Sequence, residues 1–231
     1  EAVDQIFKPF FRVEEDRNRE NGGGVGLGLA IAERAVRLAA SHFDTVILDD
    51  FTFYNTRSDA DIRARGRLSW TQYRLRKMDW VAQHVILGTA RKANPHVRMI
   101  IKYPNWYEHF QGLGYDLAKE PSIFDGIYTG TETRAPFTTD QYLQQYESYQ
   151  IFRFFENIKP GGNGGGWVDT FSISYIDRYA EQLWDTMFAK APEITLFDFR
   201  SIQRPIQPSD RAPWQGDGTG GTSFDFDAMI A

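Results

Sequence analysis

The sequence predicts an α/β protein in which parallel strands alternate with amphipathic helices. After residue 43, short apolar runs and long helical stretches follow one another in a regular order. The apolar runs are nearly continuous, as in strands of a parallel sheet that is covered by helices on its faces. Polar and acidic residues stand at the ends of these runs, where the strands of such a sheet place their functional groups.

Five strands and three long helices are predicted in turn. The strands cover 45–50, 97–103, 124–130, 165–171 and 193–199, and the first two helices cover 69–92 and 139–157. A third helix has apolar residues at the spacing of one buried helical face, and Pro192 ends it. The residues of that predicted face are Ile176, Tyr179, Ala180, Leu183, Trp184, Met187 and Phe188.

Right-handed crossovers leave two architectures for such a chain, an open doubly wound sheet or a barrel. Polar clusters follow several strands, which favours the barrel, because an open sheet concentrates them at one switch point. A complete (β/α)8 barrel needs about 250 residues. With five visible strands, the predicted fold is therefore a partial (β/α)8 barrel, preceded by a short fragment of another kind.

Composition limits the classes of function. The net charge is -5, which makes general affinity for nucleic acid unexpected. The chain has no cysteine, which excludes disulfides and thiolate metal sites. No apolar run approaches the roughly 20 residues that span a bilayer. The four histidines lack metal-ligand spacing, so we expect neither a metal nor a cofactor, although carboxylates alone could bind calcium.

Three acids are the candidate catalytic residues, because each stands at the end of a predicted strand. They are Asp50, Glu132 and Asp169. Glycoside hydrolysis commonly uses two facing carboxyl groups, and strand ends around one rim can supply them. Asp50 with Glu132 is the first predicted pair and Glu132 with Asp169 the second. Arg134 is close enough in sequence to form a structural ion pair with Glu132 instead.

Aromatic and polar residues near the same strand ends are the candidate substrate-binding residues. Rings can cover the apolar face of a sugar while polar groups bind its hydroxyls, so an oligosaccharide or polysaccharide is the expected partner. The alternative is a loop packed over the barrel end. The candidates are Asp49, Lys102, Tyr103, Asn105, Trp106 and Trp167.

Residues 1–38 differ in composition from the rest of the chain, because they are first charged and then glycine-rich. "IFKPFFR" and "GGGVGLGLA" resemble the F box and the second glycine box of the ATP-binding domain of bacterial sensor histidine kinases, over residues 6–38. The resemblance implies a lid over ATP with Mg²⁺, and glycines before a helix suit a phosphate. The nucleotide-binding residues that it implies are Gly24, Gly26, Leu27, Gly28 and Leu29.

The family's phosphoacceptor histidine, asparagine box and Asp-x-Gly box lie upstream of the F box and are not in this sequence. We therefore expect no kinase activity. The helix that follows the glycines has Leu27, Ile31, Ala35 and Leu38 on one face, which we expect to pack where a barrel helix belongs.

Residues 43–231 resemble, more loosely, bacterial (β/α)8-barrel glycosidase-like proteins, in "VILDDFTFYNT", "IIKYPNWYEHFQGLGYD", "FDGIYTGTETR" and "GGGWVDTF". The predicted domains are 1–40 (kinase-like), 41–200 (partial barrel) and 201–231 (Pro/Gly-rich tail). The barrel's parent would be periplasmic or secreted, and the parent of the opening segment cytoplasmic. Three hypotheses remain open: a carbohydrate-active barrel, an ATP-binding kinase fragment and an inert chimera.

Overall fold

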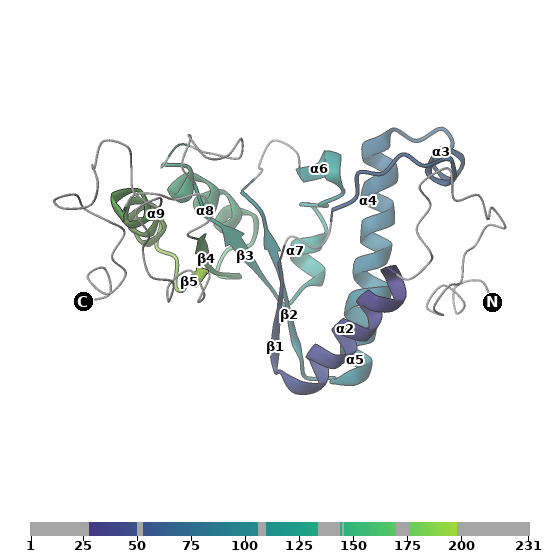
Figure 1. Ribbon diagram of the computed structural model, residues 1–231, viewed down its shortest axis with the longest axis horizontal. Coiled ribbons are helices and arrows are strands. Elements are labelled where there is room, and N and C mark those ends of the chain that lie inside the picture. The colour runs from purple at the N-terminus through teal and green to yellow at the C-terminus, as the bar shows by residue number, and fades with distance from the viewer. Residues whose placement is uncertain are drawn as a thin grey trace, which may run out of the picture. The chain divides into compact units, whose positions relative to one another are not determined.

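The computed structural model describes residues 28–49, 53–105, 110–133, 144, 146–169 and 176–197 (Figure 1). The chain divides into two compact units. The first comprises residues 1–101 and 108–126, and the second comprises residues 102–107 and 127–231. Each unit is described by itself below.

Within the described residues, five strands form one sheet in the order β1-β2-β3-β4-β5. The printed pairings of β1 with β2, β3 with β4 and β4 with β5 are all parallel. Sequential order without a switch point is the order of a barrel and not of a doubly wound sheet. The predicted α/β class and partial barrel are confirmed. The bounds are β1 (Thr45–Leu48), β2 (Arg98–Tyr103), β3 (Gly126–Gly130), β4 (Asn163–Asp169) and β5 (Ile194–Phe197).

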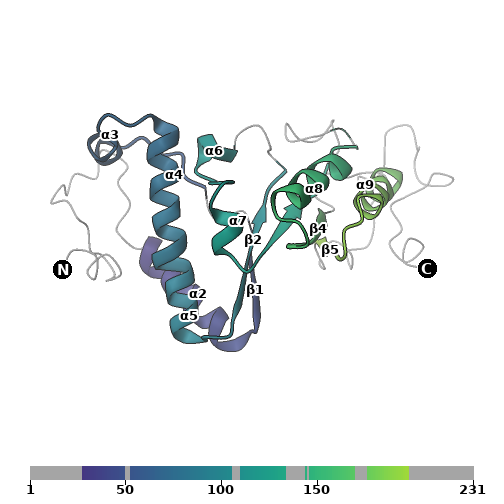
Figure 2. The same cartoon turned by 180° about the vertical axis from the view of Figure 1, so that it is seen from behind.

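In the first unit, the helix predicted over 69–92 is confirmed as three consecutive segments. They are α4 (Trp70–Trp80), a π-helical turn η2 (Val81–Leu87) and α5 (Gly88–Ala93). The described residues of this unit contain four further helices, and Figure 2 shows α2 lying beside α5. Their bounds are α2 (Gly28–His42), α3 (Asp59–Arg65), α6 (Phe110–Leu113) and α7 (Glu120–Ile123).

Helix α2 packs against α5 and η2 through a different face from the one predicted. Val36 and Ala40 are buried, whereas Ile31 and Leu38 are each 61% exposed. The predicted stripe is therefore wrong. Ala40, which is fully buried, is small enough to let the two helices approach closely.

In the second unit, α8 (Glu147–Ile158) and α9 (Ile176–Phe188) pack against each other and against β4. Both helices were predicted, but α9 buries another face. Tyr179 is buried as expected, whereas Trp184 and Phe188 are 54% and 62% exposed, and Met187 is also exposed. Polar Gln182 and Thr186 are fully buried with Tyr179. The hydroxyl of Thr186 donates to the carbonyl of Gln182, and this bond reduces the cost of burial.

Two glycines of β4 allow neighbouring strands and helix α9 to approach this strand closely. A Cβ on Gly165 would lie 2.5 Å from both the Glu193 carbonyl oxygen and the Tyr128 hydroxyl. A Cβ on Gly166 would collide with the Thr186 methyl group. The glycine run that precedes Trp167 is thus part of a strand with close neighbours on both faces.

One buried carboxylate ties together the segment after β1 and helices α3 and α4. Asp61 accepts hydrogen bonds from the hydroxyls of Tyr54, Thr56, Ser58 and Tyr73, from the Ser58 N–H, and from the Lys77 ammonium group. Burial alone would raise the pKa of Asp61, but the hydrogen bonds from the hydroxyl groups outweigh it and hold that pKa far below its usual value.

We expect Asp61→Asn to destabilise the first unit by roughly 2 kcal/mol or more, because several donors lose a charged acceptor. The carboxyl has a depressed pKa in the fold, so its contribution is complete above the unfolded value and declines as the pH falls below about 4. Hydrogen exchange of the backbone amides of residues 54–65 would measure this loss of stability. Asp59→Asn, at an exposed position of the same helix, is the control, and equal protection in both variants at neutral pH would contradict the prediction.

Candidate active site

The candidate site lies in the second unit, where β2 and β3 end. Glu132 follows β3 by two residues and is 2% exposed. Its Oε1 lies 3.5 Å from Nζ of Lys102, which is also 2% exposed and is the penultimate residue of β2. A buried carboxylate next to a buried ammonium group is stabilised in its ionised form. The structure therefore brings together two predicted site residues that are 30 positions apart in sequence.

Trp167 of β4 joins this pair. Nζ of Lys102 lies 5.0 Å from the centroid of the Trp167 ring, within the range of a cation–π contact. Successive side chains of a strand point to opposite faces. Accordingly Tyr103, the next residue of β2, stacks on Phe155 of α8 with ring centroids 4.7 Å apart, and is fully buried there.

The backbone that carries Glu132 is held through Thr131. The Thr131 N–H donates to the Trp167 carbonyl oxygen at 2.8 Å, and the Ser148 hydroxyl donates to the Thr131 carbonyl oxygen at 2.6 Å. The Thr186 hydroxyl, whose proton is donated to the Gln182 carbonyl, lies with its oxygen 2.9 Å from the Thr131 hydroxyl oxygen. Residues of β4, α8 and α9 thus all contact Thr131 and fix its position next to Glu132.

Two neighbours shape the space around Glu132. A Cβ on Gly130 would lie 2.8 Å from Oε2 of Glu132, so the absence of a side chain there leaves room for the carboxylate. The Asn105 amide donates to the Glu132 carbonyl oxygen at 2.7 Å, and Asn105 is 1% exposed. Asn105 therefore positions the segment that carries Glu132.

Tyr128 precedes Gly130 by two residues in β3 and lies on the same face of the strand, because alternate residues of a strand share a face. Its hydroxyl lies 2.7 Å from the Thr195 hydroxyl and donates to the Glu193 carboxylate at 3.3 Å. Burial, together with the Glu193 charge, raises the pKa of Tyr128 to about 12. The phenol therefore stays protonated at neutral pH and cross-links β3 with β5.

The remaining predicted site residues are not brought into this group by the described part of the structure. Asp49 follows β1 in the first unit and is exposed. Asp169 is the last residue of β4, and its side chain is outside the description, as are those of Gly28 and Leu29 at the start of α2. The residues wholly outside the described ranges are Asp50, Trp106, Arg134, Gly24, Gly26 and Leu27.

Sequence reasoning missed the supporting residues Gly130, Ser148 and Thr186 as parts of the site. The stretch "YTGTETR" carried a signal for the first, since a glycine at the end of a buried strand often marks a close approach. Ser148 and Thr186 carried none, because single hydroxyl residues within helices are common.

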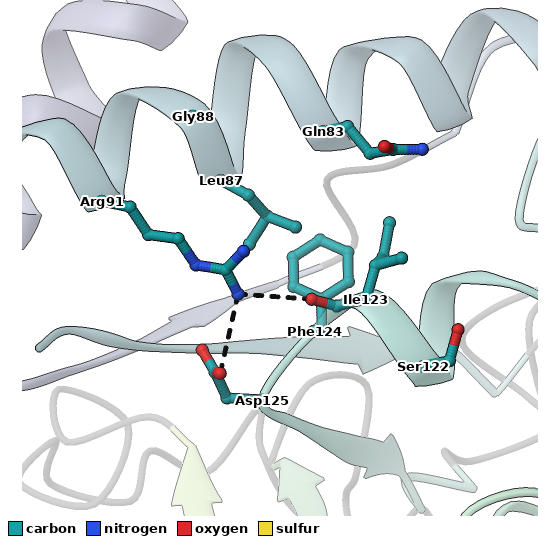
Figure 3. Close-up of a pocket in the computed structure, with 8 residues that line it drawn as sticks. All are labelled: Gln83, Leu87, Gly88, Arg91, Ser122, Ile123, Phe124 and Asp125. Atoms are coloured by element: carbon teal, nitrogen blue, oxygen red, sulfur yellow. Dashed lines mark hydrogen bonds and ion pairs between the residues drawn. The ribbon is translucent and has the colours of Figure 1, made fainter. Parts of the chain in front are cut away.

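The first unit has a pocket of its own, shown in Figure 3. Arg91 of α5 reaches across it, donating to the Ile123 carbonyl oxygen and pairing with Asp125 at 3.6 Å. Asp125 immediately precedes β3, so this pocket lies at the amino end of that strand. Barrel enzymes place catalysis at the opposite, carboxyl ends, so we assign this pocket no catalytic role.

In the described part of the chain, no group of three or more histidine, aspartate and glutamate residues is placed to hold a metal ion. Among the helices in that part, none is long and apolar enough to cross a membrane.

A partial α/β barrel with a buried glutamate–lysine pair at its strand ends has the architecture of a barrel protein with polar residues at the carboxyl ends of its strands. The comparison with known families agrees. The family described as "Probable glycosyl hydrolase, catalytic domain" matches residues 30–231. The chain belongs to this family, and the glycosidase-like part of the resemblance is confirmed.

Relatives of two kinds are found. An uncharacterized protein of Saccharolobus solfataricus is 26% identical over 224 residues, which are 85% of this chain and 35% of that protein. This chain therefore spans about a third of that relative's length. The sensor histidine kinase CpxA of Klebsiella pneumoniae and that of Escherichia coli are 59% identical over 37 residues, 16% of this chain and 8% of theirs. No solved structure matches the chain.

We expect Lys102 and Glu132 to be energetically coupled. Lys102→Met leaves a carboxylate buried without its ammonium neighbour and should destabilise the second unit by about 3–5 kcal/mol. In the double variant, Glu132→Gln also removes the buried negative charge and should restore part of the lost free energy of unfolding. We expect a coupling energy between the two positions above about 1 kcal/mol. Urea unfolding of the two single variants and the double variant measures this, and strictly additive losses would contradict the pairing.

Proposed function

We propose that this chain acts on glycosidic bonds of a carbohydrate, with Glu132 as a central carboxylate. The observation that carries the proposal is the buried Glu132–Lys102 pair at the carboxyl ends of β3 and β2, in a chain of a glycosyl hydrolase catalytic-domain family. The half-buried ring of Trp167 beside Lys102 supplies an apolar surface on which a sugar ring can stack.

The contact with Lys102 suggests a role for Glu132. Because an ammonium group 3.5 Å away favours the carboxylate form, Glu132 suits a base or nucleophile rather than a general acid. As nucleophile it attacks the anomeric carbon while the bond to the leaving oxygen breaks, and water later hydrolyses the glycosyl–enzyme bond. As base it removes a proton from the water that attacks directly.

The second carboxyl group, which protonates the leaving oxygen, then has to come from another strand end. Asp50, after β1, and Asp169, at the end of β4, remain the two candidates. We favour Asp169 because it ends the strand that carries Trp167, next to the strand that positions Glu132. This chemistry requires no metal or cofactor.

We expect Glu132→Gln to lower kcat by at least about 10³-fold on any glycoside that the chain hydrolyses, because the neutral amide is neither a base nor a nucleophile. A panel of aryl glycosides and oligosaccharides would be assayed. Glu156→Gln is the matched control: Glu156 lies on α8 and accepts from the Gly161 N–H in the turn before β4, away from the strand ends. Equal activity of the two variants would refute the assignment.

A second proposal concerns the opening segment. We infer that it derives from a sensor histidine kinase and is joined to the barrel, because a short stretch of the chain is 59% identical to CpxA whereas the glycosyl hydrolase match begins at residue 30. The boxes that bind adenine and Mg²⁺ in those kinases lie outside the part that residues 6–38 resemble, so these residues by themselves supply only part of a nucleotide pocket.

We accordingly expect millimolar ATP with Mg²⁺ to leave the melting temperature of the chain unchanged, because a ligand stabilises only a protein that binds it. Differential scanning fluorimetry with and without the nucleotide measures this. A saturable rise in melting temperature that Gly26→Glu removes would contradict the expectation and favour the ATP-binding alternative.

A further inference from the structure

A strongly basic segment lies in the first unit of this acidic chain. Between Arg57 and Lys77 there are seven basic residues and only two acidic ones, Asp59 and Asp61, although the whole chain has a net charge of -5. The segment comprises α3, the turn after it and the first part of α4. The candidate catalytic group does not use any of these residues.

Three of its arginines gather around one indole ring. The guanidinium carbons of Arg57, Arg65 and Arg74 lie 5.6, 4.8 and 5.6 Å from the centroid of the Trp70 ring. We call these four residues the Trp70 cluster. Arg57 is exposed, Arg65 and Trp70 are half-buried, and Arg74 is buried. Like charges brought so close repel one another unless an anion compensates them.

Within the described ranges, no carboxylate forms an ion pair with an arginine of the cluster. Arg74 donates to the carbonyl oxygens of Gly112 and Asn55, and Arg65 to that of Leu68. These acceptors are neutral. The nearby Asp61 is already surrounded by hydroxyl donors and Lys77, so it does not neutralise the cluster.

The cluster is built on rigid elements. Helices α3 and α4 both begin with capping boxes, at Ser58 and Ser69, and the Tyr54 N–H donates to the Leu113 carbonyl oxygen. Helix α3 follows β1 in the order of described elements, and α4 starts at Trp70 itself (Figure 1). The cluster therefore belongs to the connection after the carboxyl end of β1, where a barrel enzyme binds its substrate.

From this geometry we infer that the Trp70 cluster is a binding site of the first unit for an anionic sugar, one that carries a carboxylate or sulfate group. Guanidinium groups bind both anions through paired, charge-assisted hydrogen bonds. The inference rests on the proposed function, which makes a carbohydrate the ligand, and adds that this carbohydrate is acidic. A nucleic acid is also a polyanion that arginines bind, so it is the alternative that the test includes.

Binding to two matched pairs of probes tests the inference. The first pair is oligogalacturonate and its fully methyl-esterified form; the second is dextran sulfate and dextran. Isothermal titration at low salt should show binding only to the charged member of at least one pair, weakened by added salt. Arg57→Gln should weaken it at least about 5-fold and Arg57→Lys less, because lysine keeps the charge without the planar fork. Arg98→Gln, exposed at the amino end of β2, should leave binding unchanged.

Three results would overturn the inference: binding to neither charged probe, equal losses in Arg57→Gln and Arg98→Gln, or tighter Arg57-dependent binding of an oligodeoxythymidylate. Glu132→Gln separates this inference from the proposed function. Hydrolysis of a neutral glycoside that requires Glu132, without binding of the acidic probes, would refute the binding site alone. Arg57-dependent binding of an acidic probe, with no hydrolysis that requires Glu132, would support the binding site and refute the proposed function.

Discussion

Parallel pairing of short buried strands places the candidate catalytic residues of this chain. Because the strands run in one direction, their carboxyl ends and the segments that follow them are the natural place for polar side chains. β2 ends with Lys102 and Tyr103, and β3 is followed by Thr131 and Glu132. The pocket of the first unit is lined by Asp125, the residue that precedes β3, and so belongs to the amino end of that strand, where barrel enzymes do not place catalysis.

The candidate site shows how a buried charge is kept in place. Glu132 lies beside a lysine, but its backbone depends on neutral contacts: Asn105 binds its carbonyl oxygen, and Thr131 is held by β4, α8 and α9. A carboxylate held by its surroundings in one position is better suited to catalysis than a mobile one, because less reorganisation is needed when charge develops. The small residues Gly130 and Gly166 allow these elements to approach.

In the first unit, the buried carboxylate of Asp61 is held mainly by hydroxyl donors. Asp61 is almost completely buried, and its hydrogen-bond donors come from the segment after β1 and from α3 and α4. It therefore acts as a fixed anchor rather than a titrating group near neutral pH. With that carboxylate occupied, the arginines around Trp70 keep their positive charge available, which distinguishes this surface from the rest of an acidic chain.

The sequence by itself determined the order of strands and helices, the barrel class and the prominence of Glu132 and Lys102, because apolar periodicity and strand-end polarity are local signals. Strand bounds agree within a few residues; for example, β2 was predicted over 97–103 and spans Arg98–Tyr103. Only the tertiary structure decided which helix faces are buried and which side chains meet. Thr186 is buried on α9 while Phe188 is exposed, because Thr186 finds a partner in Thr131, 55 positions away. Such a choice depends on the packing of distant elements, which no local pattern encodes.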